Sequence, residues 1–118
     1  MTGAVVDALF RELRSVADGD GTHAESARVA LGDAAVEQRL NAAIRALAGH
    51  RGPQSSTCPS DAARAVGGDG WRDLMDAARD AARDLARRGL VQITQRGEVL
   101  DPDAEWRGPI RIRWADLP

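Results

Sequence analysis

The sequence predicts a mostly helical α+β protein with one small antiparallel sheet. Two observations support this prediction. Apolar residues recur at helical spacing over three long segments, and apolar and polar residues alternate in VQITQ and IRIRW near the C-terminus. A length of 118 residues suits one domain, or one domain with an extension.

The N-terminal part is expected to be a helical extension. A helix predicted over residues 3–17 has a stripe at spacing i, i+4, i+8 and i+11, formed by Val5, Leu9, Leu13 and Val16. DGDG ends this helix, and a short helix follows at 24–31. We therefore assign residues 1–32 to the extension and residues 33–118 to the main domain.

The main domain begins with a helix predicted over residues 34–49. Asp33 is expected to cap its N-terminus, and Pro53 forbids its continuation. The polar segment QSSTCP then leaves room for a loop and one short strand. A shorter helix is expected over residues 61–66, with Ser60 as its N-cap, because a serine oxygen accepts from backbone N–H groups one turn on.

Residues 71–88 form the longest predicted helix, which GGDG precedes and Gly89 ends. Two strands, VQITQ and EVL, are expected to pair across a tight turn at Arg96 and Gly97, and IRIRW supplies a third strand. This order of helix, short strand, two helices across a glycine-rich turn, and hairpin is that of a winged helix-turn-helix domain.

Several stretches of the main domain occur in a characteristic order. They are HRGPQSSTCPSDAAR, then W-R-x-L-M, then ITQRGEVLDP and finally GPIRIR. Together, over about residues 34–114, they resemble a small bacterial domain family of unknown function whose members look winged-helix-like. The resemblance implies this fold and a loose association with DNA-binding proteins. It implies no catalytic or ligand-binding residue.

The longest predicted helix carries one apolar face and two charged stripes. At about 100° per residue, Trp71 falls on the apolar face with the leucines and most alanines. One exposed stripe is basic and contains Arg72, Arg79, Arg83 and Arg87. A second stripe lies beside it and is acidic, formed by Asp73, Asp76, Asp80 and Asp84.

Two interpretations of this helix remain open. In the first it recognises DNA, because arginine pairs bidentately with guanine and neutralises phosphates. The candidate contacts, on this helix, the short helix and the wing turn, are Arg64, Arg72, Arg79, Arg83, Arg87 and Arg96. In the second the helix is only solvated, with pairs such as Asp76–Arg79, Asp80–Arg83 and Asp84–Arg88 contributing about 0.2–0.5 kcal/mol each.

Composition limits the class of protein. All 16 cations are arginine, typical of a GC-rich, actinobacterial-like composition. A net charge of −2 and a pI near 5.6 count against an indiscriminate nucleic-acid binder, which is usually basic. No apolar run suits a membrane span, and the N-terminus does not resemble a signal peptide. One cysteine cannot form an internal disulfide, so we expect a cytoplasmic protein.

Neither an enzyme nor a metal or cofactor site is expected. Cys58 lies near a predicted helix start, where a thiol pKa can fall, but a thiolate enzyme also needs a base. Neither His23 nor His50 belongs to a recognisable motif, so Cys58 is interpreted as a small buried side chain. One cysteine and two histidines lack the spacing of a zinc site. Trp106 is either a lid on the core or a contact residue.

The leading hypothesis is a small cytoplasmic DNA-binding or transcription-associated protein acting on double-stranded DNA. The alternative is a protein–protein interaction module on the same scaffold without DNA, which the acidic pI and the aspartates favour. The apolar stripe of the 3–17 helix either caps the domain or pairs with a second copy or another protein. A continuous positive face formed by the basic stripe together with Arg96, Arg111 and Arg113 would favour DNA binding. Interruption of that face by the aspartates would favour the interaction module.

Overall fold

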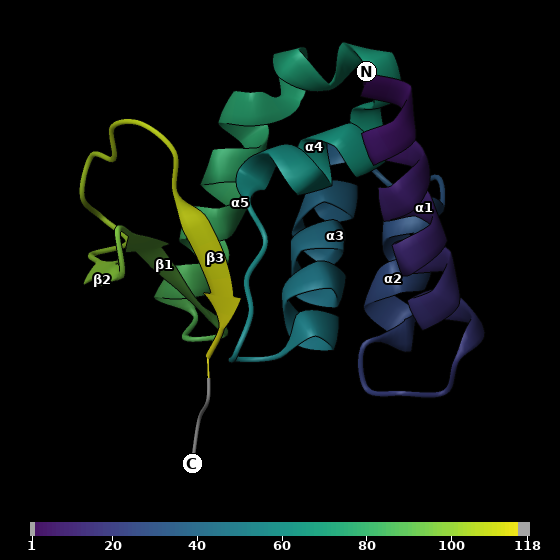
Figure 1. The fold of residues 1–118 in the computed structure, drawn as a ribbon, viewed down its shortest axis with the longest axis horizontal. Helices are drawn as coiled ribbons and strands as arrows, with labels where there is room; N and C mark the ends of the chain where they lie inside the picture. Colours follow the sequence, from purple (N-terminus) through teal and green to yellow (C-terminus); the bar gives the residue numbers. More distant parts are fainter. Residues whose placement is uncertain (1, 116–118) are drawn as a thin grey trace.

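The computed structural model describes residues 2–115, and the side chains of residues 5–115. Its elements, in chain order, are α1 (Thr2–Asp18), α2 (Ala24–Leu31), α3 (Val36–Arg51), α4 (Pro59–Gly67), the 3-10 helix η1 (Gly68–Leu74), α5 (Met75–Arg87), β1 (Val91–Gln95), β2 (Glu98–Leu100) and β3 (Arg111–Trp114) (Figure 1). The predicted α+β fold, mostly helical with a small antiparallel sheet, is confirmed.

The sheet has the strand order β2-β1-β3, with both pairs antiparallel. Thr57, just before α4, adds one bridge to the outer edge of β3, through two backbone hydrogen bonds of 2.7 and 2.8 Å with Ile112. The short strand expected in QSSTCP is therefore reduced to a single bridge. Arg96 and Gly97 both have positive φ, 54° and 85°, as a two-residue hairpin turn requires. The arrangement is consistent with a winged-helix-like domain.

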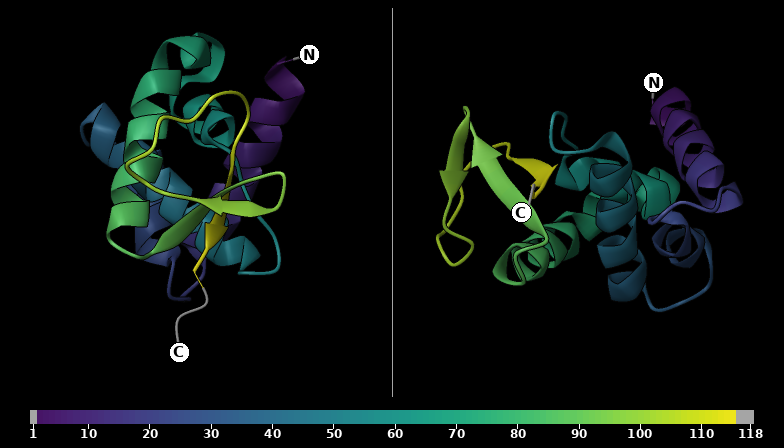
Figure 2. Two further views of the ribbon diagram at one scale, coloured as in Figure 1. Left: turned by 90° about the vertical axis from the view of Figure 1, so that its left-hand side faces the viewer. Right: turned by 90° about the horizontal axis from the view of Figure 1, so that it is seen from below.

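The core lies between the sheet and the helices, with α3 at its centre. Figure 2 shows the sheet on one side, α1 and α2 on the other, and α3, α4 and α5 between them. α3 contacts α1, α2, α4, α5 and β3. The large side chains that are completely buried come from several of these layers and include Leu13, Leu40, Ile44, Leu47, Leu85, Ile93 and Ile112.

The N-terminal extension packs against the main domain. In α1 the stripe turns inward at Leu9 and Leu13, which are buried. The buried residues of α2 are alanines, at positions 24, 27 and 30, and Val29 and Leu31 pack partly buried against the core. Small side chains allow α2 to approach α3 closely. Leu9 and Leu13 therefore cap their own chain, while Val5 at the start of the stripe stays exposed.

Arg51, at the end of α3, joins the extension to the main domain. It forms a two-point ion pair with Glu12 of α1, with N···O distances of 2.7 and 3.0 Å. Its Nη1 donates to the Ser56 carbonyl at 3.0 Å and to Asp61 of α4 at 3.3 Å. Thr57 donates to the same Asp61 carboxylate at 2.7 Å. The hydrogen bond to Glu12 is the main reason that the pKa of Arg51 is raised.

Both predicted N-caps are wrong. Ala35, not Asp33, precedes α3, and no side chain caps that helix. Cys58 rather than Ser60 is the residue before α4, because Pro59 takes the first helical position, where its fixed φ and missing N–H carry no penalty. Ser60 lies inside the helix, with its Oγ 3.0 Å from the Cys58 Sγ.

The longest predicted helix, over residues 71–88, is two elements instead of one. Residues 68–74 form the 3-10 helix η1, and the α-helix α5 begins only at Met75. Gly68 has a φ of 58°, and Gly70 has non-helical torsions, so the chain is distorted at the glycine-rich turn. Trp71 thus belongs to η1, and its side chain is half-buried.

Candidate functional site

The six arginines predicted to contact DNA come from four parts of the fold. Arg64 lies on α4, Arg72 on η1, and Arg96 in the turn between β1 and β2. The other three lie on α5 and are Arg79, Arg83 and Arg87. The α5 arginines turn toward the segment that joins β2 to β3. We call this segment, residues 101–110, the wing loop.

Arg79 and Arg83 hold the wing loop against α5. Arg79 donates to the carbonyl oxygens of Trp106, at 3.0 Å, and Gly108, at 3.3 Å. Arg83 donates through Nη1 to two more loop carbonyls, those of Pro102 and Ala104. Both guanidinium groups also lie over the Trp106 ring, 5.8 and 4.2 Å from its centroid. The donors of these two arginines therefore point at their own chain.

Trp106 is the residue that the loop contributes to the core. Its side chain is buried, and its indole N–H donates to the Asp101 carbonyl at 3.0 Å. Of the two interpretations left by the sequence, the lid on the core is confirmed. Arg87 reaches the same loop through an ion pair of 2.6 Å with Asp103, but both side chains are more than half exposed. Such a pair contributes about 0–1 kcal/mol.

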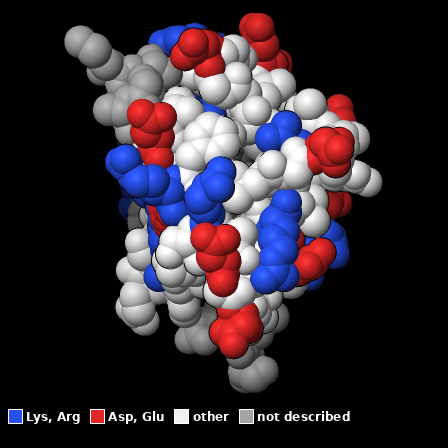
Figure 3. Space-filling model, turned by 90° about the vertical axis from the view of Figure 1, so that its right-hand side faces the viewer, with Lys and Arg blue, Asp and Glu red and all other residues white. Residues whose placement is uncertain are grey.

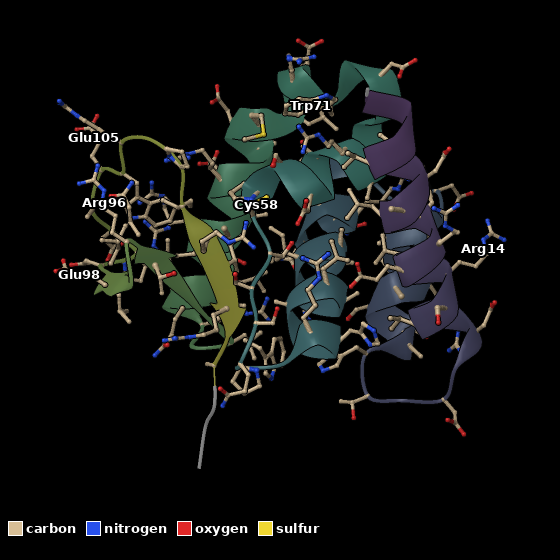
Figure 4. The ribbon with its side chains drawn as sticks, viewed as in Figure 1. Arg14, Cys58, Trp71, Arg96, Glu98 and Glu105 are labelled. Carbon is tan, nitrogen blue, oxygen red and sulfur yellow. The ribbon has the colours of Figure 1, made fainter. Side chains whose placement is uncertain are left out.

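Arg64 and Arg72 both stack on Trp71. Their guanidinium carbons lie 4.2 and 4.6 Å from the centroid of its ring. This stack links η1 to α4 and engages both guanidinium groups in cation–π contacts. Figure 4 shows Trp71 at the end of the molecule where α1 begins. Arg72 remains exposed, whereas the Arg64 side chain is half-buried.

With the α5 arginines turned toward the wing loop, the outward side of η1 and α5 is acidic. Five aspartates recur there at intervals of three and four residues, and all are exposed: Asp69, Asp73, Asp76, Asp80 and Asp84. We call them the acidic stripe. Among the described residues, their one ion pair is Asp84–Arg88, at 3.8 Å. The expected pairs Asp76–Arg79 and Asp80–Arg83 do not form, because both arginines reach across to the wing loop.

Arg96 stands apart from the other candidates. Its side chain is exposed at the hairpin turn, and Figure 4 places it at the outer end of the wing together with Glu98 and Glu105. Arg107 is also exposed, on the wing loop. Basic and acidic side chains thus both occur at this end of the wing.

The opposite face of the molecule is also mixed in charge. Figure 3 views the side on which α1 lies and shows blue and red side chains interleaved. Arg14 points away from the molecule there (Figure 4). This face therefore offers no large patch of one sign for a polyanion.

The described residues do not assemble a catalytic set around Cys58. The thiol is half-buried beside Ser60 and lines an open pocket of about 530 Å³ with Met75 and Pro109. That pocket has no histidine in its lining. His23 instead packs edge-on against Trp114, with ring centroids 4.8 Å apart. Between residues 2 and 115, no three His, Cys, Asp or Glu side chains are placed to hold a metal ion.

The contacts of Arg51 could not be found by sequence reasoning. Glu12 and Arg51 are 39 residues apart, and neither belongs to a motif that would mark it.

Within the described part of the chain, no helix is both long enough and apolar enough to cross a membrane.

Comparison with known proteins finds one family, which matches the chain from α3 onward. A family described as "Protein of unknown function (DUF3253)" matches residues 37–115, from the first turn of α3 to the residue after β3. No curated protein matches the chain. The matched range leaves α1 and α2 outside the family's shared part.

Proposed function

The chain belongs to the DUF3253 family, and we propose that it is a protein-interaction module that binds a basic partner through the acidic stripe. The observation that carries this proposal is the position of the charges on η1 and α5. Arg79 and Arg83 donate to the wing loop, while the five aspartates face solvent.

Electrostatics favour a protein partner over DNA at this surface. In a helix-turn-helix protein the second helix of the motif enters the major groove, and here that place belongs to η1 and α5. Phosphates would meet five aspartates, whereas the exposed Arg87 and Arg88 are already ion-paired with carboxylates of the chain. Because Arg72 is the exposed arginine left there without an ion pair among the described residues, little counterion release would drive binding. The same field attracts a basic surface and speeds its association.

Fluorescence anisotropy with two labelled probes tests this proposal. One probe is a random-sequence DNA duplex, and the other is a short peptide rich in arginine and lysine. At about 50 mM salt, where phosphate contacts are strong, we expect the peptide to bind and the duplex to remain free. The variant D69N/D73N/D76N/D80N should lose peptide binding.

The control is D18N/D20N, which removes two exposed acidic charges from the extension. It should bind the peptide as the wild type does. Duplex binding at low salt, or peptide binding that survives the four substitutions on the stripe, would overturn the proposal.

DNA binding remains the second candidate. It is favoured by exposed Arg72 on η1 and by exposed Arg96 and Arg107 at the wing, the positions from which a winged-helix protein would contact a duplex. Saturable duplex binding that is weakened by both R72A and R96A would establish it in place of the interaction module.

A further inference from the structure

An open pocket with several charged residues in its lining lies between the extension and the main domain. Its volume is about 520 Å³, and α2, α3 and the residue that follows α5 line it. This size is within the range of about 300–1,000 Å³ found for small-ligand sites. Four lining side chains are charged, two of each sign: Glu25, Glu37, Arg45 and Arg88. No aspartate of the acidic stripe lines this pocket, although Arg88 is the ion-pair partner of Asp84.

Arg45 is the unusual residue of this pocket. It is half-buried, and its Nε is inaccessible to solvent without a hydrogen-bond partner among the described residues. The other two arginines of α3 have acceptors within the chain. Arg39 donates to the Ala30 carbonyl at 3.0 Å, and Arg51 donates to Glu12. A partly desolvated cation with an unsatisfied donor is costly unless something pairs with it.

The other charges of the pocket do not pair with Arg45 within 4 Å. Glu25 is 80% exposed and lies 3.6 Å from Arg28, whereas Arg88 is paired with Asp84. Glu37 has no ion pair among the described residues. The lining thus holds a cation and an anion that are both available.

The spacing of residues on α3 sets the length of a ligand that could contact both Arg45 and Glu37. Residues 37, 41 and 45 follow one another at single-turn intervals, and all three line the pocket. At 1.5 Å per residue, Glu37 and Arg45 are about 12 Å apart along the axis. Asn41 lies between them and can both donate and accept a hydrogen bond.

We propose that this pocket binds an extended zwitterion, with a carboxylate on Arg45 and a cationic amine toward Glu37. A guanidinium matches a carboxylate with two parallel hydrogen bonds, and Arg45 donates to no acceptor among the described residues. A dianion fits less well, because Glu25 and Glu37 would repel its second charge. A compact α-amino acid spans less of the distance between the two charges than a longer molecule such as 4-aminobutyrate.

The test is a titration of the ¹⁵N-labelled full chain, followed by amide chemical shifts. The probes are 4-aminobutyrate, butyrate, butylamine and succinate, each taken about tenfold above a Kd of about 1 mM, which is weak for specific binding. We expect 4-aminobutyrate to give saturable shifts within residues 22–29 and 37–45. Butyrate should bind at least threefold more weakly, and succinate and butylamine more weakly still.

Three variants assign the contacts. R45M should abolish binding of both 4-aminobutyrate and butyrate. E37Q should weaken the binding of 4-aminobutyrate and leave the binding of butyrate unchanged. R14M, at an exposed position on α1, is the matched control and should bind as the wild type does. Because Arg45 has an unsatisfied buried donor, R45M should unfold at the same or a higher temperature than the wild type, which separates lost binding from lost folding.

Three results would overturn the proposal. One is the absence of saturable shifts with any probe. Another is binding that is unchanged in R45M. The third is butyrate or succinate binding as tightly as 4-aminobutyrate, which would leave no role for Glu37.

Discussion

Replacing Arg51 with methionine should detach the N-terminal extension from the main domain. Methionine retains an apolar stem of similar length but removes every donor. The variant loses the two-point ion pair with Glu12, the hydrogen bond to the Ser56 carbonyl and the contact with Asp61. It also leaves two carboxylates without their shared cation.

The size of the effect follows from burial. The side chains of Arg51, Glu12 and Asp61 are 24%, 23% and 16% exposed, so they are neither surface groups nor fully buried. Removing one partner of a buried pair costs about 3–5 kcal/mol, whereas an exposed pair contributes about 0–1 kcal/mol. We expect R51M to lower the free energy of unfolding by about 3 kcal/mol.

Urea denaturation followed by circular dichroism measures this loss, and hydrogen exchange locates it. Amides of α1 should lose protection before those of α3. The control R14M removes an exposed arginine from α1 and should change stability by less than about 0.5 kcal/mol. In a double-mutant cycle with E12Q, the two losses should couple by about 0.5–3 kcal/mol. A loss below about 1 kcal/mol in R51M, or strictly additive losses, would refute the reasoning.

Three further predictions concern the wing loop and the packing of His23. R83L should release the wing loop, destabilise the fold by about 1–3 kcal/mol through the lost carbonyl partner and speed proteolytic cleavage within residues 101–110, whereas R107L should leave cleavage unchanged. G49A should destabilise by about 1–3 kcal/mol in thermal unfolding, because its new Cβ would lie 2.3 Å from the His23 ring, and the displaced ring should alter tryptophan fluorescence through Trp114. Burial, then the charges of Arg45 and His50, lower the pKa of His23 from 6.5. The unfolded chain therefore takes up this proton at higher pH than the folded chain, and stability should fall as pH drops below 6.5 through the lower folded pKa. H23Q should reduce that slope in denaturation curves measured across this range, and an unchanged slope would contradict the assignment.

The helical wheel of α5 could not distinguish the DNA hypothesis from the interaction-module hypothesis, because the difference depends on contacts that form only in the folded chain. A helical wheel assigns Arg79 and Arg83 to an exposed stripe, but it cannot show that the wing loop, which follows two strands later, covers them. The aspartates of that wheel all stay in solvent, as do Arg72 and Arg87. Hydrogen bonds from Arg79 and Arg83 to backbone carbonyls, rather than the periodicity, weaken the DNA hypothesis.

Periodicity and turn residues in the sequence predicted which helices and strands form better than they predicted where the helices begin. The short helix at 24–31 and the strands VQITQ and EVL have the expected bounds, because their periodicity and the flanking glycines are local signals. The capping predictions at Asp33 and Ser60 were wrong. The α3 helix starts at Val36, too late for Asp33 to be its N-cap, and Pro59 takes the first position of α4, which places Ser60 inside that helix. The single helix expected over residues 71–88 failed because the stack of Arg64, Trp71 and Arg72 and the distorted glycines hold η1 as a separate element.

By itself the sequence determined the fold class, the order of helices and strands, and the faces that become apolar, since these depend on residues within one or two turns of each other. Only the tertiary structure decided which charges remain available. Arg51 finds Glu12 across 39 residues, Arg83 finds its carbonyls across about 20, and Arg45 is left without an acceptor. Charges are neutralised by whatever lies within a few ångströms, and in a folded chain those neighbours are set by packing and not by distance along the sequence.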